Sequence, residues 1–361
     1  MGSDGMTECE QSASLARRSY GCLSDGREVE TWILRGAGGM ELEILSYGAA
    51  VRRLAVPDGK GDLVDVVLGH ETMDGWEQAN ESYFAVIAGR IAGRVPGGHL
   101  LFDGQKYQLA CNDRGNHLHG GPEGLDKRLW QGESVAMEDG TVGVRMRYRS
   151  PDGEGGYPGT VEIFATFLLT PDNAFVFETE ASADQLTPVS LAQHSYFNLG
   201  GAGNGSAEGH VVQIFADHVM STDETMTPLG RSAVVDGTAA DLRQARVLAE
   251  VIPGLWQQHG DLYQLSGAED LKPAARVFDP QSGRVMEVST THDFLQFYTA
   301  AHLDGSILGK GGVAYPKHGG LCFECQGYPD PSAGFGDILV QPGQMQRHRT
   351  IYAFSNEGTR S

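Results

Sequence analysis

The sequence predicts an all-β protein, a large antiparallel β-sandwich with few short helices. Three observations predict this fold class. Glycine supplies 50 of the 361 residues, roughly twice its average share of about 7%. Short apolar and β-branched runs recur between Gly, Asp and Pro residues. Stretches with helical periodicity are scarce, so the helices that would connect parallel strands are missing.

The predicted strands are short segments that alternate between polar and apolar residues or run apolar. They include Glu41–Leu45, 142–148 (VGVRMRY), Val161–Leu169 and 174–178 (AFVFE). Hairpin turns are predicted between such runs at Asp103-Gly104, Asp139-Gly140 and Asp172-Asn173. One helix is predicted over residues 239–252, because apolar residues recur on one face and Pro253 follows.

Composition limits the partners that the protein can have. Acidic residues outnumber basic ones by 47 to 27, so the formal net charge is −20. Such a field repels polyanions, which excludes nucleic acid as a partner. No apolar stretch approaches the roughly 18 residues that a membrane span requires. We therefore expect no membrane association.

The first residues, MGSDGMTECE, include acidic side chains where a signal peptide has a basic start and an apolar run. We therefore expect a cytoplasmic protein, and the odd number of cysteines, five, favours reduced thiols. Residues 1–25 are expected to be disordered or loosely attached. Residues 26–361 are expected to form a single β-sandwich catalytic domain that is a monomer or a weak dimer.

Two motifs resemble metal or redox sites. Cys322 and Cys325 have the CxxC spacing, but they lie in a predicted strand, where residues three apart point to opposite faces. His117 and His119 share a strand face and could ligate a metal as in cupins. No second motif supplies further histidine ligands, so we predict no metal. His119 is interpreted as a hydrogen-bonding residue and His117 as incidental.

Acid and base candidates lie in two further predicted strands. His194, Tyr196 and Asn198 fall on one face of the first, opposite Ser195. So polar a face is typical of a wet cavity, although a hydrogen-bonded core histidine would give the same pattern. Glu324 lies in an otherwise apolar strand, where desolvation should raise its pKa. A charged residue in such a position usually has a function.

Together these segments resemble the aldose 1-epimerase (galactose mutarotase) family, from about Leu34 to the C-terminus. The segments that carry the resemblance, in order, are 89–94 (GRIAGR), 116–121 (NHLHGG), 194–199 (HSYFNL), 290–299 (TTHDFLQFYT) and 315–330 (YPKHGGLCFECQGYPD). The resemblance implies a large antiparallel sandwich with an open cleft. It also implies interconversion of the α and β anomers of hexoses such as galactose and glucose, with no cofactor.

The resemblance also implies roles for individual residues. Glu324 matches the general base and His194 the general acid. The residues that match sugar-binding positions are Arg94, His119, Asp261 and Gln296. We expect the pKa of an imidazolium at position 194 to lie above its usual value of about 6.5, because of the nearby carboxylate.

The chain departs from the family pattern at several positions. Gly93 stands where family members commonly have Asn, so one amide contact to the sugar is expected to be missing. Leu262 follows Asp261, where His or Asn is usual, and Asp293 stands where Pro is frequent. These departures bear on the choice of hexose more than on the type of reaction.

Three alternative functions remain open at the level of sequence. A glycoside hydrolase could use Glu324 and Asp261 as a carboxylate pair. A non-catalytic sugar-binding regulator could keep the cleft, but the presence of both His194 and Glu324 counts against it. A hexose-phosphate epimerase would need a cluster of arginines to hold phosphate, and only Arg90 and Arg94 are candidates.

Overall fold

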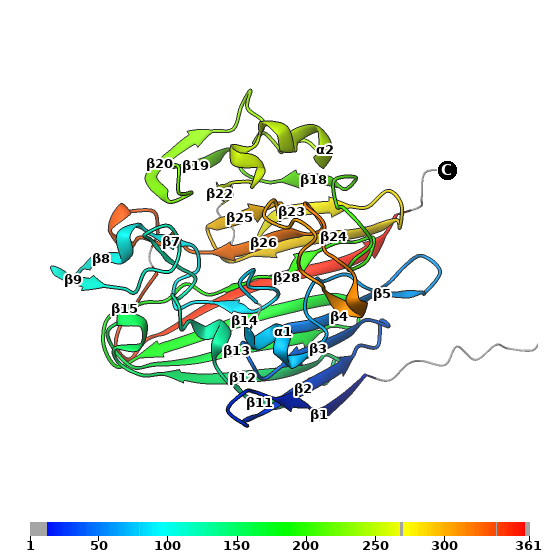
Figure 1. The fold of residues 1–361 in the computed structure, drawn as a ribbon, viewed down its shortest axis with the longest axis horizontal. Helices are drawn as coiled ribbons and strands as arrows, with labels where there is room; N and C mark the ends of the chain where they lie inside the picture. Colours follow the sequence, from blue (N-terminus) through cyan, green and yellow to red (C-terminus); the bar gives the residue numbers. More distant parts are fainter. Residues whose placement is uncertain (1–12, 79, 268–269, 337, 358–361) are drawn as a thin grey trace, which may run out of the picture.

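The computed structural model describes residues 13–78, 80–267, 270–336 and 338–357. Strands dominate these residues, and nearly all the pairings are antiparallel (Figure 1). Three sheets of nine, six and five strands form the body of the molecule, and the described residues also form four two-stranded ribbons. The fold class that the sequence predicts, an antiparallel β-sandwich, is confirmed.

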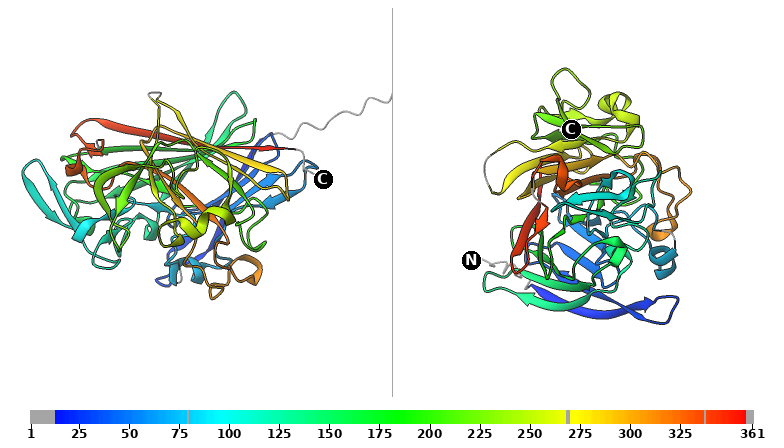
Figure 2. Two further views of the ribbon diagram at one scale, coloured as in Figure 1. Left: turned by 90° about the horizontal axis from the view of Figure 1, so that it is seen from above. Right: turned by 90° about the vertical axis from the view of Figure 1, so that its left-hand side faces the viewer.

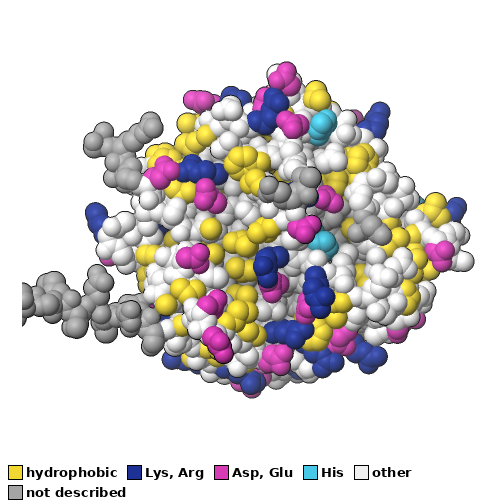
Figure 3. Space-filling view, turned by 180° about the vertical axis from the view of Figure 1, so that it is seen from behind, with side chains coloured by type: hydrophobic (Ala, Val, Ile, Leu, Met, Phe, Trp, Pro, Cys, Tyr) yellow, Lys and Arg dark blue, Asp and Glu magenta, His cyan; other side chains and the backbone are white. Residues whose placement is uncertain are grey.

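The nine-stranded sheet is the larger layer of the sandwich, seen edge-on in the left panel of Figure 2. Its strands, in spatial order, are β11 (Gln131–Ala136), β12 (Val142–Ser150), β13 (Val161–Leu169), β14 (Ala174–Ala183), β28 (Met345–Asn356), β24 (Arg284–Thr290), β23 (Lys272–Phe278), β18 (Val211–Ile214) and β21 (Arg246–Val247). Its outer face carries interleaved basic and acidic side chains (Figure 3). Glu180, for example, pairs with both Arg145 and Arg347.

Two smaller sheets form the facing layer. The six-stranded sheet contains β17 (Tyr196–Phe197), β26 (Leu321–Gln326), β25 (Phe294–Tyr298), β22 (Leu262–Gln264), β19 (His218–Thr222) and β20 (Pro228–Val234). The five-stranded sheet contains β1 (Ser14–Cys22), β2 (Glu28–Arg35), β3 (Glu41–Leu45), β4 (Val51–Pro57) and β5 (Leu63–Asp65).

The remaining elements are short. The ribbons pair β7 (Arg94–Val95) with β10 (His117–Leu118), β6 (Ile87–Ala88) with β16 (Ala192–Gln193), β8 (His99–Phe102) with β9 (Gln105–Gln108), and β15 (Thr187–Pro188) with β27 (Leu339–Val340). The α-helices are α1 (Met73–Gln78) and α2 (Leu248–Val251). The 3₁₀ turns are Pro96–Gly98, Leu125–Lys127, Glu154–Gly156, Ile252–Gly254, Trp256–Gln258, Lys310–Gly312 and Pro331–Ala333. No helix in the described part of the chain is long and apolar enough to cross a membrane.

The main hydrophobic core lies between the layers. The nine-stranded sheet contributes Phe167 and Phe175, the six-stranded sheet Phe297 and Phe323, and the five-stranded sheet Leu42, all of them buried. Successive residues of a strand point to opposite faces of the sheet. Where one residue points into this core, the next therefore points to the other face of its sheet. On the six-stranded sheet that other face lines a cavity.

The local pattern predicted several elements correctly. Glu41–Leu45 and Val161–Leu169 are strands with the expected ends, and 142–148 and 174–178 lie within longer strands. The three predicted turns each join a hairpin, at β8–β9, β11–β12 and β13–β14. Cys322 and Cys325 are free thiols in β26 that pack in different clusters, as expected for residues on opposite faces.

The helix predicted over 239–252 is wrong for most of its length. Only Leu248–Val251 forms α2, and Arg246–Val247 forms β21, an edge strand paired with β18. The backbone N–H of Ile214 also bonds to the carbonyl of Leu242. Leu242 and Leu248 are buried as the pattern required, but pairing with the sheet edge satisfies the backbone in place of a helix.

The predicted loose N-terminal segment, residues 1–25, also needs correction. Residues 1–12 lie outside the described residues, but Ser14–Cys22 forms β1, paired along its length with β2. Leu15 packs against the main core. The extent of the single domain, 26–361, stays a prediction.

Candidate active site

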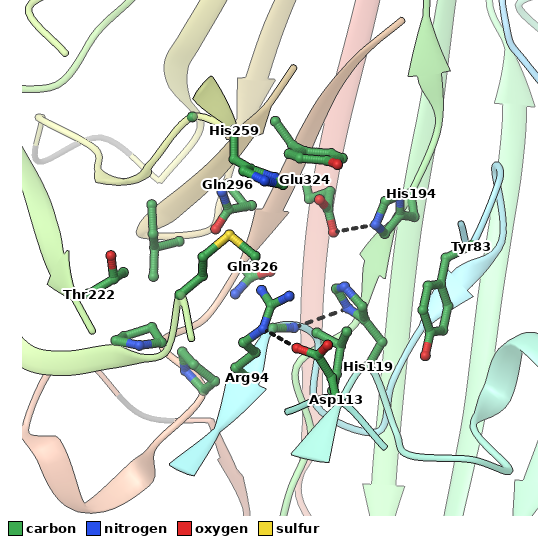
Figure 4. Close-up of a pocket in the computed structure, with 18 of the residues that line it drawn as sticks. Tyr83, Arg94, Asp113, His119, His194, Thr222, His259, Gln296, Glu324 and Gln326 are labelled. Carbon is green, nitrogen blue, oxygen red and sulfur yellow. Dashed lines mark hydrogen bonds and ion pairs between the residues drawn. The ribbon is translucent and has the colours of Figure 1, made fainter. Parts of the chain in front are cut away.

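A cavity of about 260 Å³ opens on the face of the six-stranded sheet turned away from the core. Each of the six strands contributes to it, and the β7–β10 ribbon supplies a second wall through Arg94 and Leu118 (Figure 4). The structure brings together all six residues that the sequence singled out. The cavity is lined by Arg94, His119, His194, Asp261, Gln296 and Glu324.

Glu324 lies in β26 and is only 2% exposed. Burial raises its pKa to about 8, although the positive charge of Arg94 acts in the opposite direction. Its Oε2 atom makes no hydrogen bond within the described residues. The sequence-based expectation of a raised pKa is therefore confirmed, and the carboxyl group has an oxygen free to meet a ligand.

His194 contacts Glu324 in the cavity. Its Nε2 atom lies 3.5 Å from Oε2 of Glu324, a close contact that does not meet the geometry of a hydrogen bond. Burial lowers the pKa of His194 to about 4, and the charges of His302 and Arg94 act in the same direction. The expected rise of this pKa is wrong, because desolvation dominates and Glu324, with a pKa of about 8, carries no charge in the pH range where His194 titrates.

The two shifts have a joint consequence for protonation. At pH values between about 4 and 8, Glu324 and His194 together hold one proton. The neutral pair and the pair of carboxylate and imidazolium contain the same number of protons and differ only in where the proton sits. A buried pair of this kind can accept a proton at one atom and donate one at the other.

His119 has its ring orientation set by the backbone. The N–H of Gly93 donates to Nδ1 of His119 at 3.2 Å, as the dashed line in Figure 4 indicates. Burial holds the pKa of His119 well below its usual value, so the ring is neutral. Because Nδ1 accepts, the ring proton must sit on Nε2. His119 therefore offers a hydrogen-bond donor.

The hydrogen bond from Gly93 to His119 also bears on whether the cavity could hold a metal ion. Ligand atoms of His119, His194 and Glu324 lie within 4.8 Å of one another, close enough to hold an ion. A ligating histidine binds through one nitrogen and donates from the other. Nδ1 of His119 faces the N–H of Gly93 and cannot donate there, so this donor set does not fit a metal. His117 is buried elsewhere and contacts the Tyr157 hydroxyl and the Ala110 carbonyl.

Three further predicted residues surround the pair. Nε of Arg94 donates to Asp113 at 2.7 Å, and its terminal nitrogens have no partner in the described part of the chain. Burial alone raises the pKa of Asp261 to about 6. Gln296 stands directly opposite Glu324 in the β25–β26 register, and its amide bonds to the carbonyl of Phe297 at 2.9 Å.

The structure also reveals cavity residues to which the sequence assigned no role. They are chiefly Tyr83, Asp113, His259, Tyr298 and Gln326. Two of these residues could have been found from the sequence. Tyr298 and Gln326 each lie two residues after a predicted site residue, and residues two apart share one face of a strand. Tyr83, Asp113 and His259 come from loops, where no periodicity marks them.

The polar strand face predicted around His194 is only partly in the cavity. His194 and Tyr196 line it, but Asn198 does not. The Asn198 amide instead donates to the carbonyls of Gly205 and Gly319. Asn198 therefore holds two loops together.

A sandwich whose open cavity holds a buried carboxyl and imidazole, beside donors and acceptors suited to hydroxyl groups, defines the class of acid–base enzymes that act on neutral polar substrates. Comparison with known proteins agrees with this class. A profile of the aldose 1-epimerase family matches residues 30–353. The chain therefore belongs to the aldose 1-epimerase family, whose members are isomerases.

Individual relatives cover almost the whole chain. Galactose mutarotase of Rattus norvegicus is 40% identical over 347 residues, 95% of this chain and 99% of the relative. Aldose 1-epimerase of Escherichia coli K12 is 30% identical over 344 residues, 92% and 97% of the two chains. The crystal structure of galactose 1-epimerase from Lactobacillus acidophilus NCFM has a TM-score of 0.84 at 25% identity, covering 96% of this chain and 100% of that one.

Proposed function

We propose that this protein interconverts the α and β anomers of D-hexoses, galactose and glucose among them, with Glu324 as general base and His194 as general acid. The observation that carries the proposal is the buried Glu324–His194 pair, 3.5 Å apart and lining the cavity. The family of the chain and the name of the rat relative support it.

In the proposed reaction the carboxylate of Glu324 takes the proton of the C1 hydroxyl. The bond between C1 and the ring oxygen breaks, and the ring oxygen takes the proton held by His194. The open aldehyde turns about the C1–C2 bond. Closure on the other face of C1 reverses both transfers, so each group regains its starting state and no external proton or electron is needed.

The surrounding residues suit both the reactants and the proton transfer. The charge of Arg94 favours the carboxylate form of Glu324, which is the form that can act as a base. The terminal nitrogens of Arg94 and Nε2–H of His119 can donate to hydroxyls. Asp261 and Gln296 can accept from hydroxyls, and together these groups can hold the sugar while C1 turns.

The phosphate-binding alternative is disfavoured by the contacts of Arg90. Its guanidinium is buried and donates to Ser150 and to the carbonyls of residues 150, 151, 158 and 159, so it has a structural role. The cavity retains Arg94 and, at its rim, Arg114, but also the carboxyl groups of Asp113 and Asp261. A phosphate dianion would be repelled by such carboxylates.

We also propose that the enzyme works in the cytoplasm as a monomer or a weak dimer. Four cysteines in the described residues are free thiols, as a reducing compartment favours. Size-exclusion chromatography with light scattering, repeated over a range of concentrations, measures the oligomeric state. A concentration-independent dimer would contradict the proposed state.

Polarimetry tests the proposed activity. Freshly dissolved α-D-galactose and α-D-glucose should each reach rotational equilibrium faster with the protein than with the heat-inactivated protein. A protein that binds galactose without accelerating the change would instead be a sugar-binding regulator. Release of reducing sugar from an aryl galactoside would indicate a glycoside hydrolase that uses Glu324 and Asp261.

A further inference from the structure

Gln326 is a buried cavity residue whose side chain is incompletely satisfied. It lies in β26 two residues after Glu324, so both side chains project from the same face of the strand, and both line the cavity (Figure 4). Gln326 is 1% exposed. Its Oε1 atom has no hydrogen-bond partner within the described residues.

The other end of the amide is weakly held. Nε2 of Gln326 donates to the carbonyls of Ala92 and Gly327, each at 3.4 Å, near the limit of a hydrogen bond. Gly93 leaves room for this amide, because a Cβ at position 93 would lie 2.9 Å from Nε2. The glycine and the glutamine therefore share one part of the cavity wall.

Another buried glutamine shows how a structural amide is satisfied. Gln193 is 2% exposed and does not line the cavity. Its Nε2 donates to the Ala85 carbonyl at 2.7 Å and its Oε1 accepts from the Ser195 N–H at 2.8 Å. A buried carbonyl without a donor is costly in free energy. Gln326 bears that cost beside the cavity, where a ligand can supply the donor.

We propose that Gln326 is a substrate-binding residue whose Oε1 accepts a hydrogen bond from one sugar hydroxyl other than the C1 hydroxyl, and that it thereby contributes to the choice of hexose. This inference rests on the proposed function, because the donor is a hydroxyl of the sugar that Glu324 and His194 act upon. A neutral hydroxyl suits a neutral carbonyl, and the hydroxyl oxygen remains free to accept from another group.

The test replaces Gln326 by Met, which has a similar volume and no acceptor of comparable strength. With D-galactose, Gln326→Met should raise KM and lower kcat/KM about tenfold with kcat nearly unchanged, the pattern of lost ground-state binding. The 2-, 3-, 4- and 6-deoxy sugars are then compared. For one of them, wild type and variant should have the same kcat/KM, since the bonded hydroxyl is absent in both cases.

Thermal unfolding separates this role from a structural one. Gln326→Met should melt at or above the wild-type temperature, because it removes an unsatisfied buried carbonyl. Gln193→Met, the matched control, should melt lower, because two hydrogen bonds are lost. The proposal is overturned if Gln326→Met leaves KM for galactose unchanged. It is equally overturned if the variant lowers kcat/KM by the same factor with every deoxy sugar. It is also overturned if Gln326→Met and Gln326→Leu both fail to fold.

Saturation-transfer NMR with galactose distinguishes failure of this inference from failure of the proposed function. If the wild type does not accelerate mutarotation, the proposed function fails. Gln326 is then tested on binding alone. Weaker saturation transfer in Gln326→Met than in the wild type would support the contact, and equal transfer would overturn it.

Discussion

The backbone N–H of Gly93 donates to Nδ1 of His119, and this single bond decides what His119 can do in the cavity. It places the ring proton on Nε2, which makes the histidine a donor to a hydroxyl and a poor ligand for a metal. Gly93 itself adopts φ = +84°, a conformation that glycine accepts readily and other residues rarely do. The glycine therefore serves the site through its backbone.

The missing amide contact expected from the sequence at Gly93 predicts a lower KM for Gly93→Asn, and this geometry predicts the opposite. The Asn side chain would start 2.9 Å from the Gln326 amide and would require a left-handed backbone. We expect a higher KM and a lower melting temperature, with kcat less affected. Gly93→Ala is the control for backbone strain alone. A lower KM in Gly93→Asn would restore the original expectation.

Chelation should leave the activity intact, because the tautomer of His119 does not fit a metal ligand. Exhaustive dialysis against EDTA should change the rate of optical equilibration by less than the error between preparations. The control is the same dialysis without chelator. Loss of activity in EDTA that a divalent metal restores would refute the prediction and revive the interpretation of His119 as a ligand.

Glu324→Gln should lower kcat by roughly 10²-fold or more, with a smaller change in KM. Glutamine keeps the shape of the side chain and can still hydrogen-bond to the sugar, but it cannot exchange a proton near neutral pH. The rate is measured by polarimetry on α-D-galactose. His194→Asn should cause a loss of the same order. A Glu324→Gln protein with near-full activity would remove the base from the mechanism.

The pH profile should follow the one-proton state of the pair. Below about pH 4 both groups are protonated and Glu324 cannot accept, whereas above about pH 8 both are deprotonated and His194 cannot donate. The plot of kcat/KM against pH should therefore be flat between these values and fall on both sides. Asp261, whose pKa is about 6, could add a step, which Asp261→Asn would remove. A limb centred near pH 6.5 that persists in Asp261→Asn would contradict the assignment.

The raised pKa of the buried Glu324 carboxyl group should also make the free energy of unfolding depend on pH. Between pH 4.5 and about 8 the unfolded chain loses the Glu324 proton while the folded protein keeps it, so wild-type stability falls as pH rises. Glu324→Gln has no titrating group at this position, so its stability should not fall with pH for this reason. The unfolding free energy of Glu324→Gln relative to the wild type should therefore rise by several kcal/mol between pH 5 and pH 9. Denaturant unfolding at both pH values measures the difference, and an equal difference at the two would refute the raised pKa.

The sequence alone was enough to predict those parts of the fold that depend only on residues close together along the chain. The alternation in Glu41–Leu45 and Val161–Leu169 set the ends of β3 and β13, and the turn residues marked three hairpins. The six site residues were proposed from the resemblance to the aldose 1-epimerase family. Five of them lie in its short motifs and Asp261 lies outside those motifs, but all six line the cavity. The chemical roles of these residues await the experiments above.

Contacts between distant segments decided the rest. The helical pattern of 239–252 gave way to pairing of β21 with β18, because the sheet edge offered backbone partners in place of those within a helix, while Leu242 and Leu248 were still buried. The direction of the His194 pKa shift depended on its burial in the folded protein. The unpaired carbonyl of Gln326 became visible only in three dimensions, since hydrogen-bond satisfaction and desolvation depend on which groups the fold brings together.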